Sequence, residues 1–547
     1  MASSPESGTG GYRQFVCENK SQHSRSCSGG ETFLSSTQEA QSKEERKAWR
    51  ESRAEQYTQF FQSIYDWEVC SSEQEISGFR PCGRIPQYYF PSPKRETEWG
   101  RRLCGTHPDL GAKTAGFGWP QNGPQAELRS LRLQAERWLE RKESSIEPSA
   151  DKRTSVIARL VEDYSNCKTE GPRACNGSKL TWDGFINDFK EAVQSLQLEA
   201  GIGVPYISYG LPSHRGWVED PKLLPVLAQL TFNRLQKMLT VSFEDMTAEQ
   251  LVQNGLCDPI RLFVKGEPHK LSKLIEGRYR LIMSVSIVDQ LVARVLFQNQ
   301  NKREIALWRA IPSKPGFGLS TDEQTRDFVS SLSAVVGTSP ETLCDSWKSL
   351  VRPTDCSGFD WSVAYWMLED DITVRNHLTL ELNEATKRLR NAWLKCISNS
   401  VLCLSDGTLL AQSLPGIQKS GSYNTSSSNS RIRVMAAYHV GADWAIAMGD
   451  DCLESPNSNL TEYKELGFKV EESEKLEFCS HIFETPTRAI PVNVGKMLYK
   501  LIHGYNPECG NIEVVNNYLH AVISVLNELR FDTALVADLS RWLLPTV

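Results

Sequence analysis

The sequence predicts a fold of the mixed α/β (α+β) class, and three observations lead to this prediction. The chain has 547 residues, 40% hydrophobic and 23% charged, which is a globular composition with room for several subdomains. From Pro124 onward, apolar residues recur at the spacing of one helical face, and further helical segments follow to about residue 250. The segments WAIAM and CLE flank a tight turn at Gly449, which indicates a β-hairpin.

The bulk properties restrict the class of protein. The formal net charge is −6, so any surface that binds nucleic acid must be local. The 15 cysteines include no CxxC pair and match no common zinc spacing, which makes free thiols in a reducing cytosol the expectation. We expect neither a secretory leader nor a membrane span, because no apolar run reaches the roughly 18 residues that a span needs.

The two ends of the chain differ in composition. Residues 1–45 are rich in Ser, Gly, Glu and Gln and should form a flexible leader, whereas residues 46–62 have a charged helical pattern. Residues 70–125 are dense in Gly, Pro and aromatic residues, which predicts an irregular but packed extension. The spaced aliphatic residues of Asn517–Leu544 predict helices at the C-terminal end.

The first of four chemically informative motifs is basic. It reads VKGEPHKLSKLIEGRYRLIMS, Val264–Ser284. From Arg261 to Arg280, six lysines or arginines stand against two acidic residues, and this local excess suits phosphate groups, with a solvated charged face as the alternative. RLIMSV reads as a strand, whose alternation would direct Arg278 and Arg280 to one face, where two guanidinium groups match triphosphate oxygens.

The second and fourth motifs carry carboxylates. PTDCSGFDWSV places Asp355 and Asp360 at D-x4-D spacing, with Asp355 expected at the tip of a strand and Asp360 where a helix begins. In the fourth motif, GDD, Asp450 and Asp451 are adjacent, and such like charges repel each other strongly near a low-dielectric core. Hydration at a surface turn would relieve this repulsion, and a bound divalent cation would relieve it by neutralisation.

The third motif is rich in small polar residues. It reads KSGSYNTSSSNSRIRVMAAYHV, in which Ser420-Gly421 predicts a flexible loop. A helix after this loop would carry Thr425 and Asn429 at i and i+4 on one face, where a hydroxyl and an amide suit hydrogen bonding to a sugar or to backbone. A serine-rich linker is the alternative, and the apolar helix that follows argues against it.

In this order, the four motifs resemble those of the RNA-dependent RNA polymerases of positive-strand RNA viruses. The segment ELGFKVEESEKLEFCSHIF resembles that family's next two motifs, a turn with a distal lysine (Lys475) and a primer-gripping hairpin (Phe478 to Phe483). FGWPQNGPQAELRSLRLQAERW, MGDDCLES and EFCSH resemble, more narrowly, the polymerases of plant sobemoviruses and poleroviruses, and we favour sobemoviruses. The catalytic resemblance covers residues 260–500, and the narrower one begins near residue 115.

The resemblance implies a right-hand polymerase with fingers, palm and thumb, the palm being a small antiparallel sheet flanked by helices. The expected segments are a leader (1–45), an N-terminal extension packing on the fingers (46–125), fingers with the basic motif (126–345, motif 261–284), a palm (346–485) with a fingers insertion near 375–415, and a thumb (486–547).

The resemblance also implies the chemistry. Two metal ions would support an in-line nucleotidyl transfer, and Mg²⁺, with Mn²⁺ as a substitute, prefers carboxylate oxygens. Asp355 and Asp450 are the expected ligands, with Asp451 accessory. Lys475 would be the general acid that protonates pyrophosphate, with Lys469 as the alternative.

The same resemblance implies how the nucleotide is held. Asp360 and Asn429 would recognise the ribose 2′-hydroxyl. Ser420, Gly421 and Thr425 would assist them, and Lys265, Lys273, Arg278 and Arg280 would hold the triphosphate. A reverse transcriptase, the nearest rival enzyme, usually carries an aromatic residue in place of Asp360. A non-catalytic RNA-binding replication scaffold is the rival from another class.

The expected partners are a single-stranded RNA template, the nascent RNA, ribonucleoside triphosphates, a genome-linked viral protein and other viral replication proteins. The expected location is the host cell cytoplasm, with recruitment to membrane-associated replication complexes through partners.

Overall fold

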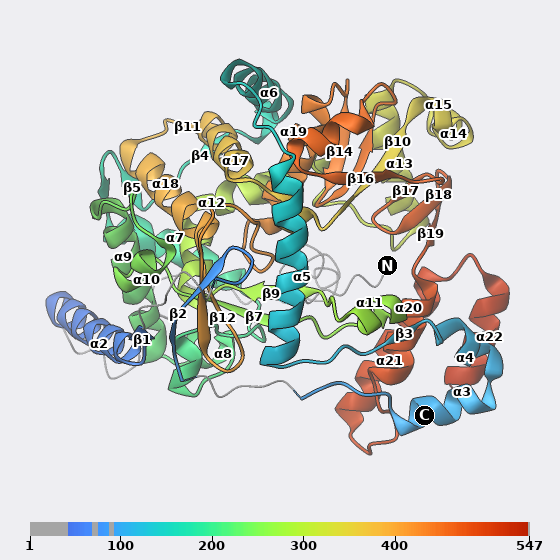
Figure 1. Cartoon of the computed structure of the whole chain (residues 1–547), viewed down its shortest axis with the longest axis horizontal. Coiled ribbons are helices and arrows are strands. Elements are labelled where there is room, and N and C mark those ends of the chain that lie inside the picture. The colour runs from blue at the N-terminus through green and yellow to red at the C-terminus, as the bar shows by residue number, and fades with distance from the viewer. Residues whose placement is uncertain (1–41, 68–74, 87–91, 545–547) are drawn as a thin grey trace.

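A computed structural model describes residues 42–67, 75–86 and 92–544 of the chain, and it has the mixed helix-and-sheet architecture that the sequence predicts. The predicted flexible leader, apart from residues 42–45, lies outside the described residues. Two sheets organise the fold, one with six strands and one with four. In Figure 1 the four-stranded sheet lies at the upper right, and the long helix α5 (Pro124–Glu143) runs down the middle of the view.

The six-stranded sheet has the order β1-β2-β13-β12-β7-β9. Its strands are β1 (Asp66–Trp67), β2 (Phe79–Arg84), β7 (Ile260–Val264), β9 (Leu281–Ser284), β12 (Val401–Cys403) and β13 (Thr408–Gln412). The pairs are antiparallel except that between β12 and β7, which is parallel. Strand β9 therefore forms one edge of the sheet, and it carries the end of the basic motif.

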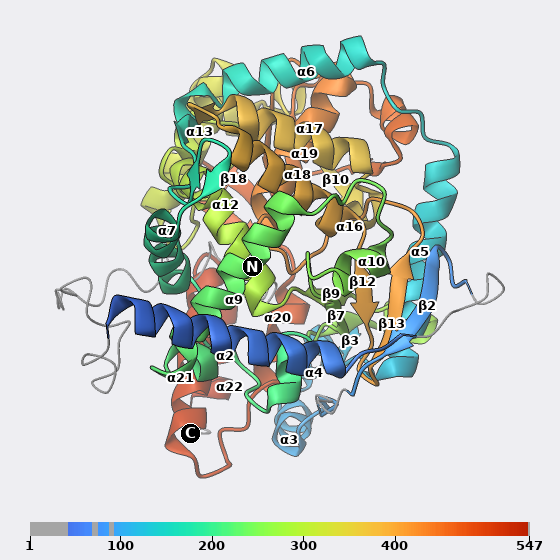
Figure 2. The same cartoon turned by 90° about the vertical axis from the view of Figure 1, so that its left-hand side faces the viewer.

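Helices surround this sheet and bury most of the apolar residues in one large core. They are α2 (Lys43–Ser63), α7 (Trp182–Gln194), α9 (Leu223–Thr240), α10 (Ala248–Gln253), α12 (Ile287–Ala306), α17 (Tyr365–His377) and α18 (Glu384–Ser398). Figure 2 shows α2 lying across α9 at the outer surface, where the charged helical pattern of residues 46–62 is confirmed. The shorter elements α8 (His214–Val218), β4 (Thr169–Glu170), β5 (Cys175–Asn176), β6 (Lys179–Leu180) and β11 (Thr379–Leu380) complete this part.

Helix α5 begins as its sequence predicts. Pro124 occupies the first turn, where its missing N–H costs no hydrogen bond, and Gly123 precedes it with φ +99°. The predicted apolar face turns inward, since Leu131, Ala135 and Trp138 are buried. Helix α6 (Ala150–Asp163) follows and lies along the top of the molecule in Figure 2.

The four-stranded sheet has the order β14-β15-β10-β16 and is antiparallel throughout. Its strands are β10 (Arg352–Ser357), β14 (Ala445–Met448), β15 (Asp451–Glu454) and β16 (Lys469–Glu472). Helix α19 (Thr425–His439) packs against β14. On another side, Ile446, Met448 and Leu453 join a second core with Phe328 and Phe478. This second core also uses α13 (Asp322–Val336), α14 (Pro340–Asp345) and the hairpin strands β17 (Glu477–Phe478), β18 (His481–Thr485) and β19 (Arg488–Pro491).

The C-terminal end is helical, as predicted, and it packs on the N-terminal extension. Helices α20 (Val494–His503), α21 (Ile512–Glu528) and α22 (Thr533–Leu543) share a core with α3 (Glu98–Thr106) and α4 (Pro108–Thr114), at the lower right of Figure 1. The expectation of an irregular segment at 70–125 is therefore wrong for residues 98–114. Trp99, Leu103 and Leu110 are buried against these C-terminal helices, and this apolar burial stabilises two short helices in a Gly-rich segment.

Two expectations from the bulk properties can be examined on the described residues. The twelve cysteines there are all free thiols, and eleven are wholly or partly buried. None of the helices in residues 42–67, 75–86 and 92–544 is both long and apolar enough to cross a bilayer.

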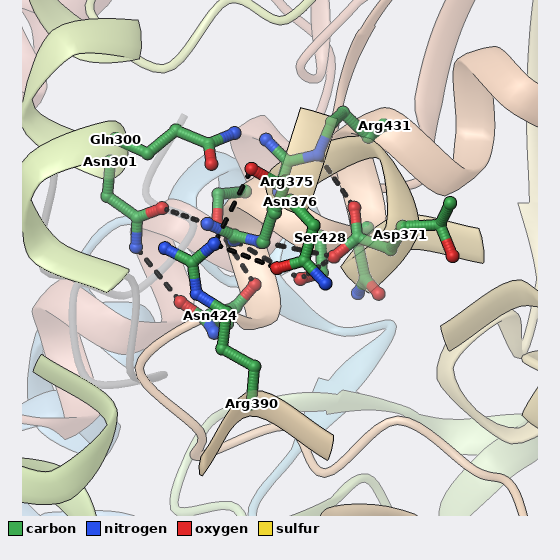
Figure 3. A network of polar contacts seen from close by, with 12 residues as sticks. Gln300, Asn301, Asp371, Arg375, Asn376, Arg390, Asn424, Ser428 and Arg431 are labelled. Carbon is green, nitrogen blue, oxygen red and sulfur yellow. Dashed lines mark hydrogen bonds and ion pairs between the residues drawn. The ribbon is translucent and has the colours of Figure 1, made fainter. Parts of the chain in front are cut away.

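A network of buried charges links α12, α17, α18 and α19 (Figure 3). Asp371 of α17 accepts from Arg431 Nε of α19 (2.6 Å) and from the Ser428 hydroxyl (2.8 Å), and Arg431 also pairs with Glu304 of α12. Arg375 is 3.3 Å from Asp371 through Nε. Burial would raise the Asp371 pKa, but the two guanidinium groups outweigh it and lower that pKa. The network therefore fixes α19 through ion pairs that are out of contact with water.

Candidate active site

Three aspartates meet at one end of the four-stranded sheet. Asp355 lies in β10, one position beyond the pair Thr354–Cys452, and so beside Asp451 at the start of β15. Asp450 occupies the two-residue turn between β14 and β15. Gly449 has φ +60° at the first turn position, which matches a type II′ hairpin and explains why a glycine precedes the two carboxylates. The predicted hairpin is confirmed, although β10 continues two residues past Asp355.

The electrostatics of these aspartates show that they share one site. Asp355 keeps an exposed side chain, yet the protein around it removes enough water to raise its carboxyl pKa to about 6, and the charge of Asp450 contributes. Burial also raises the Asp451 pKa well above its usual value, with Asp450 and Asp355 as the next causes. For Asp450, burial raises the pKa, while Arg280 and Arg433 oppose the shift.

The donor set matches a hard divalent cation in chemistry and charge. Carboxylate oxygens are the ligands that Mg²⁺ prefers, and a cation would offset both the burial and the mutual repulsion of these negative charges. In the part of the chain that the structure describes, no group of three or more His, Cys, Asp or Glu side chains is arranged so that it could hold a metal ion. The site therefore has the residues for a cation but is not a preassembled ligand cage.

A hydrogen-bonded polar pair, Asp360 and Asn429, lies beside the aspartates. Asp360, in the short helix α16 (Phe359–Ser362), accepts a hydrogen bond from Asn429 Nδ2 at 2.7 Å. Burial raises the Asp360 pKa to about 6, the bond from Asn429 opposes this, and the charge of Asp450 adds to it. The two residues paired by sequence reasoning are thus in contact, within electrostatic reach of Asp450. Gln418, which sequence reasoning missed, donates from Nε2 to Asn429 Oδ1 at 3.0 Å.

The loop at Ser420-Gly421 is docked, which corrects the prediction of a flexible loop. Gly421 N–H donates to Met283 O of β9 (2.9 Å), and Met283 N–H donates to the Ser420 hydroxyl (3.1 Å). A Cβ at Gly421 would lie 2.1 Å from Met283 O, so only glycine permits this approach. Thr425 lies at the first residue of α19, as predicted, and donates its hydroxyl to Lys419 O (2.7 Å), closing the loop.

The basic motif is organised around a buried acid. Glu267 is 3% exposed and lies 3.4 Å from Lys265 Nζ, 3.1 Å from Arg280 Nη1 and 3.3 Å from Lys496 Nζ of α20. Burial alone would raise the Glu267 pKa, but these cations lower it to about 2. Lys496 is a further residue that sequence reasoning missed, because nothing in the chain's linear order associates it with this motif.

The prediction that Arg278 and Arg280 share a strand face is wrong. Strand β9 begins only at Leu281, and a left-handed Gly277 (φ +75°) turns the chain just before Arg278. Arg278 forms an ion pair with Glu276 at 3.1 Å, whereas Arg280 lies close enough to oppose the raised pKa of Asp450 and Asp360. Lys273, in the short helix α11 (Leu271–Glu276), has its pKa lowered by burial and by Arg280, so it belongs to the same cationic cluster.

The two lysines considered as general acid, Lys475 and Lys469, lie at the surface. Lys475 precedes β17 with an exposed side chain, and Lys469 opens β16 with an exposed side chain 4.0 Å from Glu471. The choice between them as general acid stays a prediction. The hairpin of Phe478 to Phe483 is present, with Cys479 and Ser480 in its turn at φ +50° and +54°.

Arg433 of α19 is the residue that joins the parts of the site, and sequence reasoning missed it. Its fully buried guanidinium donates to Asp450 O (3.2 Å), to the Thr354 hydroxyl beside Asp355 (2.6 Å) and to the Tyr463 hydroxyl (2.9 Å). It lies one helical turn after Asn429, so α19 positions both Asn429 of the polar pair and the GDD turn. The Ser430 hydroxyl of the same helix also accepts a hydrogen bond from the Gly449 N–H (2.9 Å).

Replacing Arg433 by lysine should lower the turnover rate of the site roughly 10²-fold, because one ammonium cannot hold the turn and β10 in register together. The substrate KM should change much less, since no contact of Arg433 faces solvent. Steady-state kinetics would measure both. Arg352→Lys is the control, because Arg352 is an arginine of β10 itself, and its turnover rate should stay near that of wild type. A turnover rate for Arg433→Lys within threefold of wild type would contradict the role given to Arg433.

Comparison with known proteins adds a family match. The family described as viral RNA-directed RNA-polymerase matches residues 100–494. Protein P1-P2 of Potato leafroll virus is 66% identical over 545 residues, 99% of this chain, and Protein P2-P3 of Poinsettia latent virus is 62% identical over 492 residues, 90% of it. The Replicase polyprotein P2AB of Southern cowpea mosaic virus is 39% identical over 409 residues, 71% of this chain.

These relatives are longer than the chain, which spans 51%, 45% and 40% of their respective lengths. Identity is higher with the polerovirus protein than with the sobemovirus polyprotein, so the preference for the sobemovirus side is corrected. The match to the Potato leafroll virus protein also extends into the first 110 residues, for which the motifs gave no assignment.

Proposed function

This chain belongs to the viral RNA-directed RNA-polymerase family, and from that membership we propose that it synthesises RNA on a viral RNA template from ribonucleoside triphosphates. In this proposal it replicates and transcribes a positive-strand RNA genome. The observation that carries the proposal is the convergence of Asp355, Asp450 and Asp451 beside the Asp360–Asn429 pair and the cationic cluster of Arg280.

We assign the reaction to an in-line transfer in which the growing strand's 3′-hydroxyl attacks the α-phosphate. Asp355 and Asp450 would hold divalent cations, with Asp451 close by, and bound Mg²⁺ would supply charge neutralisation and activation of the attacking oxygen. Arg280, Lys265 and neighbouring cations orient the triphosphate, and an exposed lysine, Lys475 in our assignment, protonates the leaving pyrophosphate.

Selection of the sugar follows from the Asp360–Asn429 pair. A ribose 2′-hydroxyl can replace water as hydrogen-bond partner of these buried polar groups, whereas a deoxyribose leaves them unsatisfied. The base is chosen by pairing with the template. In the right-hand architecture that we propose, the four-stranded sheet is the palm, the six-stranded sheet and its helices are the fingers, and α20–α22 form the thumb.

The partners follow from the same proposal. They are a single-stranded RNA template, the nascent strand, ribonucleoside triphosphates and, during initiation, a genome-linked viral protein with other replication proteins. We place the enzyme in the host cell cytoplasm, recruited to membrane-associated replication complexes by those partners.

The test is incorporation of labelled nucleotides on a pre-annealed RNA primer–template, which removes any need for an initiation partner. We expect primer extension that requires the template and Mg²⁺, stops when a chelator removes the metal, and uses ribonucleotides in strong preference to deoxyribonucleotides. RNA binding is measured in parallel. A chain that binds the primer–template but extends it with neither Mg²⁺ nor Mn²⁺ would favour the replication scaffold. Preferential use of deoxyribonucleotides would favour a reverse transcriptase, and equal use of both nucleotide types would overturn the role of Asp360 and Asn429.

A further inference from the structure

Gln418 is a buried amide with no assigned role, two residues before Ser420. It is 3% exposed. Its backbone N–H donates to Asp360 O at 2.9 Å, and its side-chain Nε2 donates to Asn429 Oδ1 at 3.0 Å. Asn429 in turn donates from Nδ2 to Asp360 Oδ1 at 2.7 Å. Gln418 therefore forms a hydrogen bond with each member of the polar pair, Asp360 and Asn429.

The two side-chain hydrogen bonds from Gln418 to Asn429 and from Asn429 to Asp360 can have only one donor-to-acceptor direction. An ionised carboxylate accepts but cannot donate, so Asn429 must present its amino group to Asp360. Its carbonyl oxygen then faces the opposite way and needs a donor, which is the Gln418 amino group. If Asn429 rotated by half a turn, its oxygen would face the Asp360 carboxylate and its amino group would face that of Gln418, and two bonds would become two repulsions.

We propose that Gln418 is a specificity-determining residue, which fixes the orientation of the Asn429 amide and so sets the preference for ribose over deoxyribose. This inference rests on the proposed polymerase function and deepens it. With the amide fixed, the second Asn429 N–H and the other carboxylate oxygen of Asp360 would offer one donor and one acceptor to a hydroxyl group. A 2′-hydroxyl can satisfy both, since it donates and accepts.

The role requires a donor at position 418 and not merely a side chain of this size. Glutamate has the same shape but offers only acceptor oxygens when ionised, so it would favour the rotated Asn429 amide. Methionine has a similar length and no donor, so it would leave the Asn429 oxygen unpaired. Neither variant substitutes Asp360 or Asn429.

The experiment measures kcat/KM for a ribonucleotide and its matching deoxyribonucleotide on the primer–template, for wild type, Gln418→Glu and Gln418→Met. We expect both substitutions to lower the ribose preference roughly tenfold or more, through a lower kcat/KM for the ribonucleotide and little change for the deoxyribonucleotide. The methionine variant keeps the test decisive if the glutamate variant does not fold. Thermal melting of each variant checks that it folds.

Gln412 provides the matched control, because it is almost equally buried but its side-chain amide bonds to backbone groups and not to Asp360 or Asn429. Its Nε2 donates to Leu414 O and Gly416 O, both at 3.1 Å. Gln412→Glu should lower the melting temperature and leave the ribose preference as in wild type. A wild-type preference in active Gln418→Glu and Gln418→Met proteins would overturn the inference alone, whereas a wild-type protein without primer extension would overturn the proposed function itself.

Discussion

Replacing Asp450 by asparagine should lower the rate of RNA synthesis roughly 10³-fold or more while RNA binding is retained. Asparagine keeps the shape of the side chain in the type II′ turn but removes the negative charge that, in the proposed mechanism, would hold a divalent cation. The loss acts on the transition state, where charge on the reacting phosphate is greatest, so kcat should fall and nucleotide KM should change less. Single-turnover primer extension at saturating nucleotide measures the chemical step directly.

Asp443→Asn is the control for Asp450→Asn. Asp443 lies at the base of the same hairpin with an exposed side chain, and its backbone N–H donates to the Ser455 hydroxyl at 2.7 Å. This substitution changes the net charge equally and should leave the rate near that of wild type. If Asp450→Asn retained more than a tenth of wild-type activity, the assignment of Asp450 as a metal ligand would be wrong.

Replacing Arg431 by methionine should lower the free energy of unfolding by about 3–5 kcal/mol, because it leaves buried acids without their cation. Arg431 is fully buried between Asp371 and Glu304, which are 3% and 1% exposed. Arg375 still reaches Asp371 (Figure 3), but Glu304 loses its ion-pair partner. Urea unfolding followed by tryptophan fluorescence should show a lower midpoint.

Arg541→Met tests whether burial is the cause. Arg541 forms an ion pair with Asp538 on α22, where the side chains are 66% and 42% exposed, so its removal should cost less than about 1 kcal/mol. Equal destabilisation by the two substitutions would show that the buried network contributes no more than a surface pair. We also expect Arg431→Met to reduce synthesis more than Arg541→Met, because the network positions α19 and its Asn429.

Local patterns were sufficient to predict several elements of the site. Gly449 before two aspartates predicts a hairpin turn, and residues 425 and 429 lie on one face of any helix that contains both. The same logic failed at Arg278, because alternation applies only within a strand and the strand begins at Leu281. It failed again at residues 98–114, because their helices are stabilised by apolar contacts with α20–α22 that lie about 400 positions away in the chain.

The sequence by itself determined the family, the order of the motifs and the identity of the paired residues Asp360 and Asn429. Only the tertiary structure decided which groups support them. Gln418, Arg433 and Lys496 have unremarkable local sequence patterns, and each acts through a hydrogen bond or ion pair to a different segment. Such contacts depend on distances of about 3 Å and on the direction of a donor, and the spacing of residues along a chain fixes neither until the segments have packed.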